Sequence, residues 1–265
     1  MTITDAQLER YARHIILDNV GEEGQEVLLT SCVLVVGAGG LGAPVLQYLA
    51  AAGIGTLGII DDDMVDLSNL QRQIIHTTDR IGRPKVDSAA ESLAAINPEV
   101  AVTRFEERLT ADNVEQLVAD FDIVVDGSDN FATRYLLNDA CYFARKPLVS
   151  GALLRFEGQM ATFQAWREGD DHPCYRCLFP APPAAGLVPR CEEVGIFGAV
   201  AGVIGTLQAA EVLKLVLGLG EPLTGRMLIY DALRVGFHDM TVRRDPDCPL
   251  CSSKASIVDL GIHKD

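Results

Sequence analysis

The sequence predicts an α/β protein with a doubly wound, mostly parallel sheet that is extended by antiparallel strands. Three observations support this fold class. Strand-like and helix-like segments alternate between residues 32 and 150, and a glycine-rich turn separates the first strand from the first helix. After residue 158 the pattern changes, because residues 158–166 resemble an antiparallel strand and a Pro/Gly-rich stretch follows them. The first half is therefore expected to be Rossmann-like.

Each element has its own local signal. The capping-box spacing of Thr4 and Gln7 begins an expected N-terminal helix over about Asp5–Leu17. Pro84 suits the first turn of a helix that runs to Ile96. The other expected helices are 43–52, 111–119, 132–144 and 199–217, and the expected strands are 32–36, 56–60, 100–105, 121–126, about 148–150, 158–166, 227–230 and 237–242.

Composition excludes several classes of protein. The chain has 265 residues, 48% of them hydrophobic, and a formal charge of −15 spread without long blocks, which argues against a nucleic-acid groove. The first residues mix charges and do not resemble a secretory signal, so we expect a cytoplasmic protein. The uncharged run from residue 194 to 210 is shorter than the roughly 20 residues of a membrane span. No nucleic-acid or membrane partner is therefore expected.

The glycine turn carries a nucleotide-binding signature. Gly37, Gly39 and Gly42 satisfy G-x-G-x-x-G between a strand and a helix, and Asp61 follows at the end of the next strand, where an acid can bond a ribose hydroxyl. Amide groups at the start of the helix favour phosphate. The motif alone does not choose between NAD and ATP.

Charged residues elsewhere favour ATP. Arg13, Arg72 and Lys85 can place three cations near a polyphosphate, and Asp129 follows a buried strand where it can hold Mg²⁺. The pyrophosphate of NAD needs less positive charge. A hydride-transfer partner is also missing, because none of the histidines lies at an expected strand end in this half: His14, His76, His172, His238 and His263.

Seven cysteines divide into three groups. Two C-x-x-C pairs, Cys174/Cys177 and Cys248/Cys251, can present four thiolates to a structural Zn²⁺, and a redox pair is the weaker alternative. Cys32 and Cys141 are expected in the core. Cys191 follows Arg190 in the Pro/Gly-rich stretch, which we expect to be mobile, and is a candidate nucleophile.

Motifs from the whole chain occur together: RYARHIIL, GAGGLG, DLSNLQRQ, GRPK, SDN, CYRC and CPLC. With them the chain resembles the ThiF/MoeB/HesA family, the bacterial relatives of ubiquitin-activating enzymes. The resemblance implies ATP-dependent adenylylation of the C-terminal glycine carboxylate of a small ubiquitin-like sulfur-carrier protein of the ThiS/MoaD kind. The products would be an acyl-adenylate and pyrophosphate, ready for sulfur transfer.

The resemblance also assigns roles to single residues. Asp129 would handle Mg²⁺ with Asn130 beside it, Arg13 would complete the site of the other subunit in a homodimer, and Cys191 matches a cysteine that joins covalently to the carrier in the ThiF branch. The residues expected to contact the nucleotide are Gly37, Gly39, Gly40, Gly42, Asp61, Ser68, Asn69, Gln71, Arg72, Lys85, Asp129 and Asn130.

The expected organisation is one adenylating domain over residues 1–265, with a helical arm at about 4–18 and a mobile crossover loop at about 180–196. No C-terminal rhodanese domain is expected, so a sulfurtransferase or cysteine desulfurase would be a separate protein. The carrier and its pathway stay open among thiamin, molybdopterin, tRNA thiolation and cysteine synthesis. Two alternatives remain: an NAD(P)-dependent oxidoreductase that uses the same motif, and a non-catalytic partner similar to the inactive half of an activating enzyme.

Overall fold

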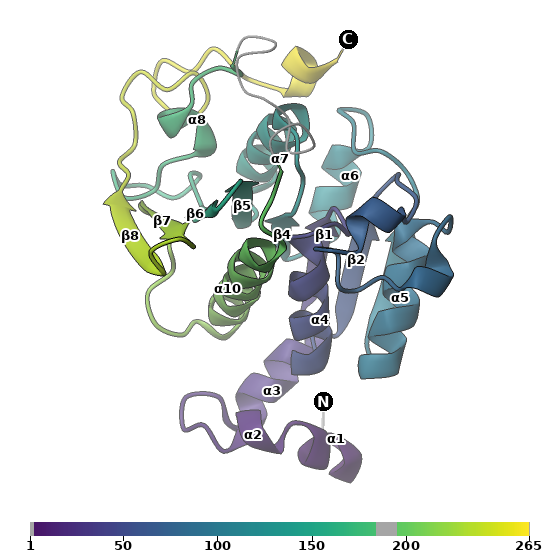
Figure 1. Cartoon of the computed structure of the whole chain (residues 1–265). Coiled ribbons are helices and arrows are strands. Elements are labelled where there is room, and N and C mark those ends of the chain that lie inside the picture. Colours follow the sequence, from purple (N-terminus) through teal and green to yellow (C-terminus); the bar gives the residue numbers. More distant parts are fainter. Residues whose placement is uncertain (1–2, 184–194, 265) are drawn as a thin grey trace.

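A single sheet of eight strands organises the computed structural model, which describes residues 3–183 and 195–264. The strand order is β3-β2-β1-β4-β5-β6-β7-β8 (Figure 1). Pairing is parallel from β3 to β5 and antiparallel from β5 to β8, so the predicted fold class is confirmed. The strands are β1 Cys32–Val36, β2 Thr56–Ile60, β3 Ala101–Phe105, β4 Ile123–Asp126, β5 Leu148–Leu154, β6 Glu157–Phe163, β7 Arg226–Asp231 and β8 Gly236–Thr241.

Alternate residues of the central strand face two separate cores. Val33 and Val35 of β1 point to the core built with α3, α4, α5 and α10, whereas Leu34 and Val36 point to the core built with α6 and α7. A strand buried on both faces has no polar positions, which explains the continuous apolar run of β1. The helices are α1 Asp5–Arg10, α2 Ala12–Ile15, α3 Gly21–Thr30, α4 Gly42–Ala52, α5 Lys85–Ile96, α6 Val114–Ala119, α7 Phe131–Ala144, α8 Tyr175–Leu178 and α10 Gly198–Leu217.

One expected helix needs correction, and one helix was not predicted. The expected helix over Asp5–Leu17 is two short helices, because Tyr11 leaves helical geometry and is buried against Gly53 while its hydroxyl accepts a hydrogen bond from Asn97. The sequence analysis also missed α3, whose two glycines, Gly21 and Gly24, obscure its helical pattern. The short 3₁₀ helices are η1 Leu67–Asn69, η2 Thr78–Arg80 and η3 Leu260–His263.

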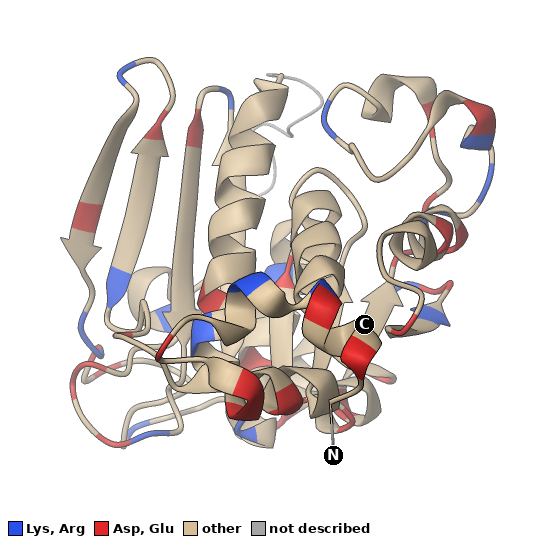
Figure 2. Ribbon diagram, turned by 90° about the horizontal axis from the view of Figure 1, so that it is seen from below, with Lys and Arg blue, Asp and Glu red and all other residues tan. Residues whose placement is uncertain are grey.

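The longest helix, α10, lies against the sheet beside α4 (Figure 1). By length and composition it is apolar enough to cross a membrane, and it is longer than the uncharged run seen in the sequence. Its charged residues are confined to its second half, Glu211 and Lys214, and Figure 2 shows the rest of the helix without charge. Glu211 is buried and accepts from the Thr162 hydroxyl and the Leu223 amide, so this side of α10 packs into the domain.

Residues 184–194 lie outside the described residues. Most of the expected crossover loop, and Cys191 with it, therefore have no structural description here.

Candidate functional site

The glycine loop between β1 and α4 needs its glycines for steric reasons. Gly37 has φ +93°, and a Cβ there would lie 2.9 Å from the carbonyl oxygen of Gly127. A Cβ on Gly42 would overlap the carbonyl of Gly37. Within the described part of the chain, the amides of Gly39 and Gly40 donate no hydrogen bond, so they are available to an anion at the start of α4.

Asp61, at the end of β2, holds the loop from one side. One carboxylate oxygen accepts from the Ala38 amide at 2.7 Å and the other from the Asp63 amide at 2.9 Å. Burial raises the pKa of Asp61, although the positive charge of Lys85 acts to lower it. Each oxygen keeps a free lone pair, so the expected contact with a ribose hydroxyl is compatible with this geometry.

Lys85 joins the same network. Its ammonium lies 2.6 Å from Asp63, its backbone amide donates to the Asp63 carbonyl at 2.9 Å, and its side chain is 6% exposed. The sequence separates Asp61 and Lys85 by a long polar loop, but the structure brings them together through Asp63. An anion entering here would meet a cation that is already fixed in place.

The SNLQRQ segment lies against the glycine loop. The position of a Cβ on Gly40 is 3.4 Å from Cγ of Arg72, and Arg72 donates from its guanidinium to the Ser68 carbonyl at 3.2 Å. Gln71 lies instead against Gly198 at the start of α10. The Asn69 side chain accepts from the amide of Asp66, the N-cap of η1, and so completes the capping box of that short helix.

Gln73 was not predicted, and it offers a second sign of a polar ligand. The residue is 4% exposed, and its amide nitrogen lies 3.6 Å from the position of a Cβ on Gly39. Among the described residues, its Oε1 atom has no hydrogen-bond partner. A buried acceptor without a partner beside a glycine loop fits a site that takes a ligand or an ordered water.

Asp129 follows β4 on a loop that two buried side chains, Asp126 and Arg134, hold in place. Asp126, fully buried at the strand end, accepts from the Ser128 amide and hydroxyl and from the Ser150 hydroxyl. Arg134 donates to Asp126 at 3.2 Å and to the Ser128 carbonyl at 3.3 Å. Asp129 itself is exposed, three residues beyond the strand, so its carboxylate is open to solvent.

Its neighbour Asn130 caps α7, because its side-chain oxygen accepts from the Thr133 amide at 2.9 Å. That bond gives Asn130 a structural function beside the expected one. Sequence reasoning placed Asp126 at the end of β4 but gave neither Asp126 nor Arg134 a role. A buried Asp at a strand end, eight residues before an Arg in the next helix, was the available signal.

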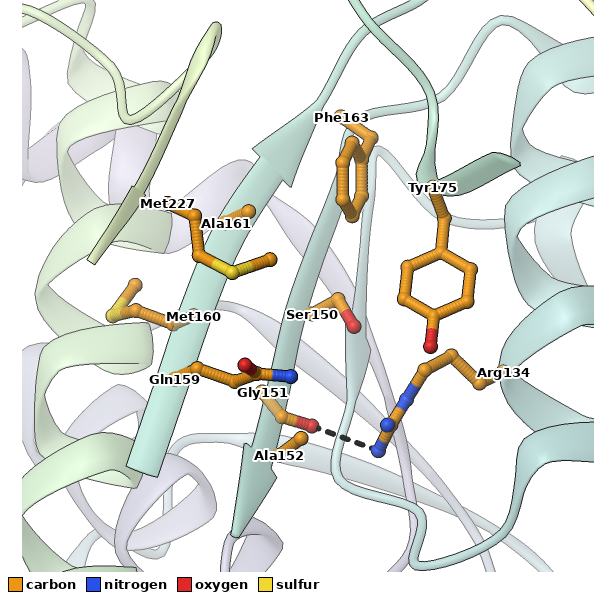
Figure 3. A pocket seen from close by; sticks show the side chains of 10 residues that line it. All are labelled: Arg134, Ser150, Gly151, Ala152, Gln159, Met160, Ala161, Phe163, Tyr175 and Met227. Carbon is orange, nitrogen blue, oxygen red and sulfur yellow. Dashed lines mark hydrogen bonds between the residues drawn. The ribbon is translucent and has the colours of Figure 1, made fainter. Parts of the chain in front are cut away.

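A narrow hollow borders this network on the α7 side (Figure 3). Arg134 and Tyr175 close one wall, and Arg134 donates to the Gly151 carbonyl at 3.1 Å, the dashed line in Figure 3. The opposite wall comes from β5, β6 and β7, with Ser150, Gln159 and Met227 among its residues. Arg134 therefore both lines this hollow and supports the loop that carries Asp129.

Arg13 lies far from this site within its own chain. Tyr11, two residues earlier, is buried against Gly53 at the end of α4, whereas the glycine loop precedes the start of α4. The 11-residue α4 separates the two by about 16 Å. Figure 1 shows the N-terminal helices beyond this far end of α4. Arg13 is exposed and does not join the other predicted residues in one chain.

The two C-x-x-C pairs meet as predicted. The thiols of Cys174, Cys177, Cys248 and Cys251 all lie within 4.8 Å of one another. Hydrogen bonds within the group lower the pKa of Cys177 to about 7 and also lower the pKa of Cys248. The bond with Cys174 makes the largest contribution in both cases. Four converging sulfurs with this spacing suit a tetrahedral, fully protein-ligated Zn²⁺. We call residues 164–178 and 244–257 the cysteine lobe.

The remaining described cysteines, Cys32 and Cys141, lie in β1 and α7. Cys141 is buried, as expected, and burial raises the pKa of its thiol. Cys32 is half-buried at the start of β1.

Comparison with known proteins assigns the chain to a family. The model of the ThiF family matches residues 11–250. The chain belongs to the ThiF family. It is 51% identical over 255 residues to the sulfur carrier protein adenylyltransferase of Thermus thermophilus, covering 96% of this chain and 94% of that protein. It is 52% identical over 251 residues to the SAMP-activating enzyme E1 of Haloferax volcanii, covering 95% and 91%.

Other ThiF-family relatives are longer. The probable adenylyltransferase/sulfurtransferase MoeZ of Mycobacterium tuberculosis is 48% identical over 245 residues, which are 92% of this chain but 62% of MoeZ. Among solved structures, E. coli MccB with MccA-N7isoASN has a TM-score of 0.80 at 23% identity, covering 94% of this chain and 76% of that one. This likeness shows that the two chains share a fold.

Proposed function

We propose that this ThiF-family chain adenylylates the C-terminal glycine carboxylate of a small ubiquitin-like sulfur-carrier protein with ATP. The observation that carries the proposal is the network of the glycine loop, Asp61, Asp63 and Lys85, which fixes a cation beside free loop amides. Relatives more than 50% identical over nearly their full lengths are named sulfur carrier protein adenylyltransferase and SAMP-activating enzyme E1.

The chemistry requires positioning more than proton transfer. A glycine carboxylate is already ionised at pH 7, so it attacks the α-phosphorus of ATP without a general base. A P–O bond to the carboxylate forms, the α–β phosphoanhydride bond breaks, and pyrophosphate leaves. Lys85 and Arg72 neutralise charge on the phosphates, and the amides of Gly39 and Gly40 orient them. Asp61 accepts from the ribose.

The two metals would have separate tasks. Asp129, with Asn130 beside it, would hold Mg²⁺, which supplies charge neutralisation at the phosphates. The exposed carboxylate on a braced loop suits this task. Zn²⁺ in the cysteine lobe would be structural, because four thiolates leave no open position for water.

The distant position of Arg13 supports a homodimer with shared sites. An exposed arginine about one helix length from its own glycine loop is free to complete the site of a partner subunit. In this proposal, residues 1–265 act as a single adenylating domain in the cytoplasm. Cys191 takes part in sulfur transfer, and the sulfur comes from a separate sulfurtransferase or cysteine desulfurase.

The test is exchange between ATP and radiolabelled pyrophosphate, with purified small carriers that end in Gly-Gly. We expect exchange that depends on the carrier and disappears when its last glycine is removed. No exchange with any such carrier, despite tight Mg-ATP binding, would favour a non-catalytic partner. Saturable NAD(P) binding with hydride transfer would favour an oxidoreductase instead.

A further inference from the structure

His76 lies directly beneath the glycine loop, although it belongs to the segment between η1 and η2. The ring is buried, with the residue 5% exposed. Its Nε2 atom lies 2.9 Å from the carbonyl oxygen of Ala38, and its Nδ1 atom lies 2.9 Å from the hydroxyl of Ser88 in α5. The ring thus joins the loop to α5.

These partners fix the tautomer of the ring. A carbonyl oxygen can only accept, so the proton must be on Nε2, which donates to Ala38. In the neutral ring Nδ1 then accepts from the Ser88 hydroxyl. Burial lowers the pKa of His76, against the opposing effect of the hydrogen bond to Ala38, and the nearby charges of Lys85 and Arg80 lower it further. The ring is therefore neutral at pH 7.

The peptide groups on both sides of Ala38 are held by this arrangement. Asp61 accepts from its amide at 2.7 Å, and His76 donates to its carbonyl at 2.9 Å. The carbonyl of Ala38 belongs to the same peptide unit as the amide of Gly39, so the bond to His76 sets the direction in which that amide points. Gly39 is one of the loop residues whose amide donates to nothing else in the described chain.

We propose that His76 is a positioning residue for nucleotide binding, which holds the Ala38–Gly39 peptide so that the Gly39 amide faces the phosphates. Glycines at positions 37, 39 and 40 make this loop intrinsically flexible, and a flexible loop loses entropy when it is ordered around a ligand. His76 and Asp61 order the loop before the nucleotide arrives. The inference rests on the proposed function only in taking the nucleotide to be ATP.

Two substitutions separate shape from hydrogen bonding. His76→Phe fills most of the ring volume without a donor, and His76→Gln can place an amide donor near the position of Nε2. We expect His76→Phe to weaken ATP binding about tenfold, the scale of one lost buried hydrogen bond and a loosened loop. KM for ATP should rise in parallel while kcat changes less than threefold, and His76→Gln should recover most of the affinity.

Two control variants test whether the loss of any buried hydrogen bond would weaken ATP binding. Thr162→Val removes the bond from the buried Thr162 hydroxyl to Glu211, between β6 and α10, and should leave ATP affinity unchanged. Ser88→Ala removes only the partner of Nδ1 and should weaken binding less than His76→Phe. ATP affinity is measured directly by calorimetry on the full chain, and folding is followed by melting temperature.

The outcomes are distinct. ATP affinity of His76→Phe within twofold of wild type, or His76→Gln as weak as His76→Phe, would overturn the inference. If His76→Phe does not fold, His76→Gln is compared with His76→Asn, whose shorter side chain does not reach Ala38; equal affinities would overturn it. Wild-type protein that binds no ATP would defeat the proposed function, whereas normal binding without carrier adenylylation would leave the role of His76 intact.

Discussion

Two regions of the molecule are built in different ways: the half of the sheet from β3 to β5 with its loops, which we call the nucleotide half, and the cysteine lobe. The loops at the ends of β1, β2 and β4 are fixed by side chains that bond backbone groups, above two large apolar cores. The cysteine lobe has a small core of its own, in which three of the six buried residues are cysteines. Contacts within the chain order the first region, whereas in the second region cysteine sulfurs converge where other domains have an apolar core.

Arg244 binds several backbone carbonyls of the cysteine lobe. Its guanidinium donates to the carbonyls of Ala165, Arg167, His172 and Cys251, so one side chain joins both halves of the lobe. These bonds join loop segments to one another. The contrast implies that metal should govern stability in the lobe, and that single polar groups should govern ligand affinity in the nucleotide half.

Loss of the metal should give the largest effect. Chelation of Zn²⁺, or Cys248→Ser, is expected to cost about 5 kcal/mol of stability and lower Tm by 10 °C or more, on the order seen for structural zinc. ATP affinity at 25 °C should change less than threefold, because no described thiol contacts the glycine loop. Tm by calorimetry and bound zinc by elemental analysis check this. Equal Tm values with and without chelator would contradict a structural metal.

Asp129→Ala should have the opposite profile. We expect the rate of adenylylation to fall about 10²- to 10³-fold, the scale for loss of one group that stabilises developing charge. Tm should stay within about 2 °C, because the side chain is exposed and Asp126 and Arg134 hold the loop independently. Asp129→Asn, of equal size, serves as the control for shape. Full activity of both variants would remove Asp129 from the site.

The regular elements were predictable because their signals are local. β1 and β2 have the predicted bounds, and the two C-x-x-C pairs were paired correctly from spacing alone. The break at Tyr11 was not predictable, because it depends on Gly53 and Asn97, which are distant in the sequence.

The supports of the site were missed for a related reason. His76 and Gln73 lie on an irregular segment without periodicity, so nothing in the sequence shows that their side chains face the glycine loop. Asp63 was one of three consecutive acids, and only the structure shows which of them pairs with Lys85. Sequence motifs identified the groups that face a ligand better than the groups that hold them.

Mixing two variant subunits tests whether the nucleotide site is built from the residues of one chain or of two. Arg13→Ala and Lys85→Ala should each reduce adenylylation about 100-fold as homodimers. If Arg13 acts across the interface, mixed dimers contain one site with both defects and one with neither. Activity should then recover to about a quarter of wild type after random exchange. No recovery, with exchange verified by mass spectrometry, would place Arg13 in the site of its own chain or outside any site.

The smallest effect concerns pH and the buried ring of His76. The pKa of His76 is lowered from its ordinary value of 6.5, so above pH 6.5 the ring is neutral in both the folded and the unfolded chain. As pH falls below 6.5, the unfolded chain takes up a proton that the folded chain does not, and stability is lost until pH reaches the lower, folded pKa. His76→Phe lacks this contribution. The Tm of wild type should therefore fall relative to the Tm of His76→Phe between pH 7.5 and pH 5.5. Parallel Tm curves would mean that the ring is protonated as readily in the folded chain, so that Ala38 is held by a charged donor.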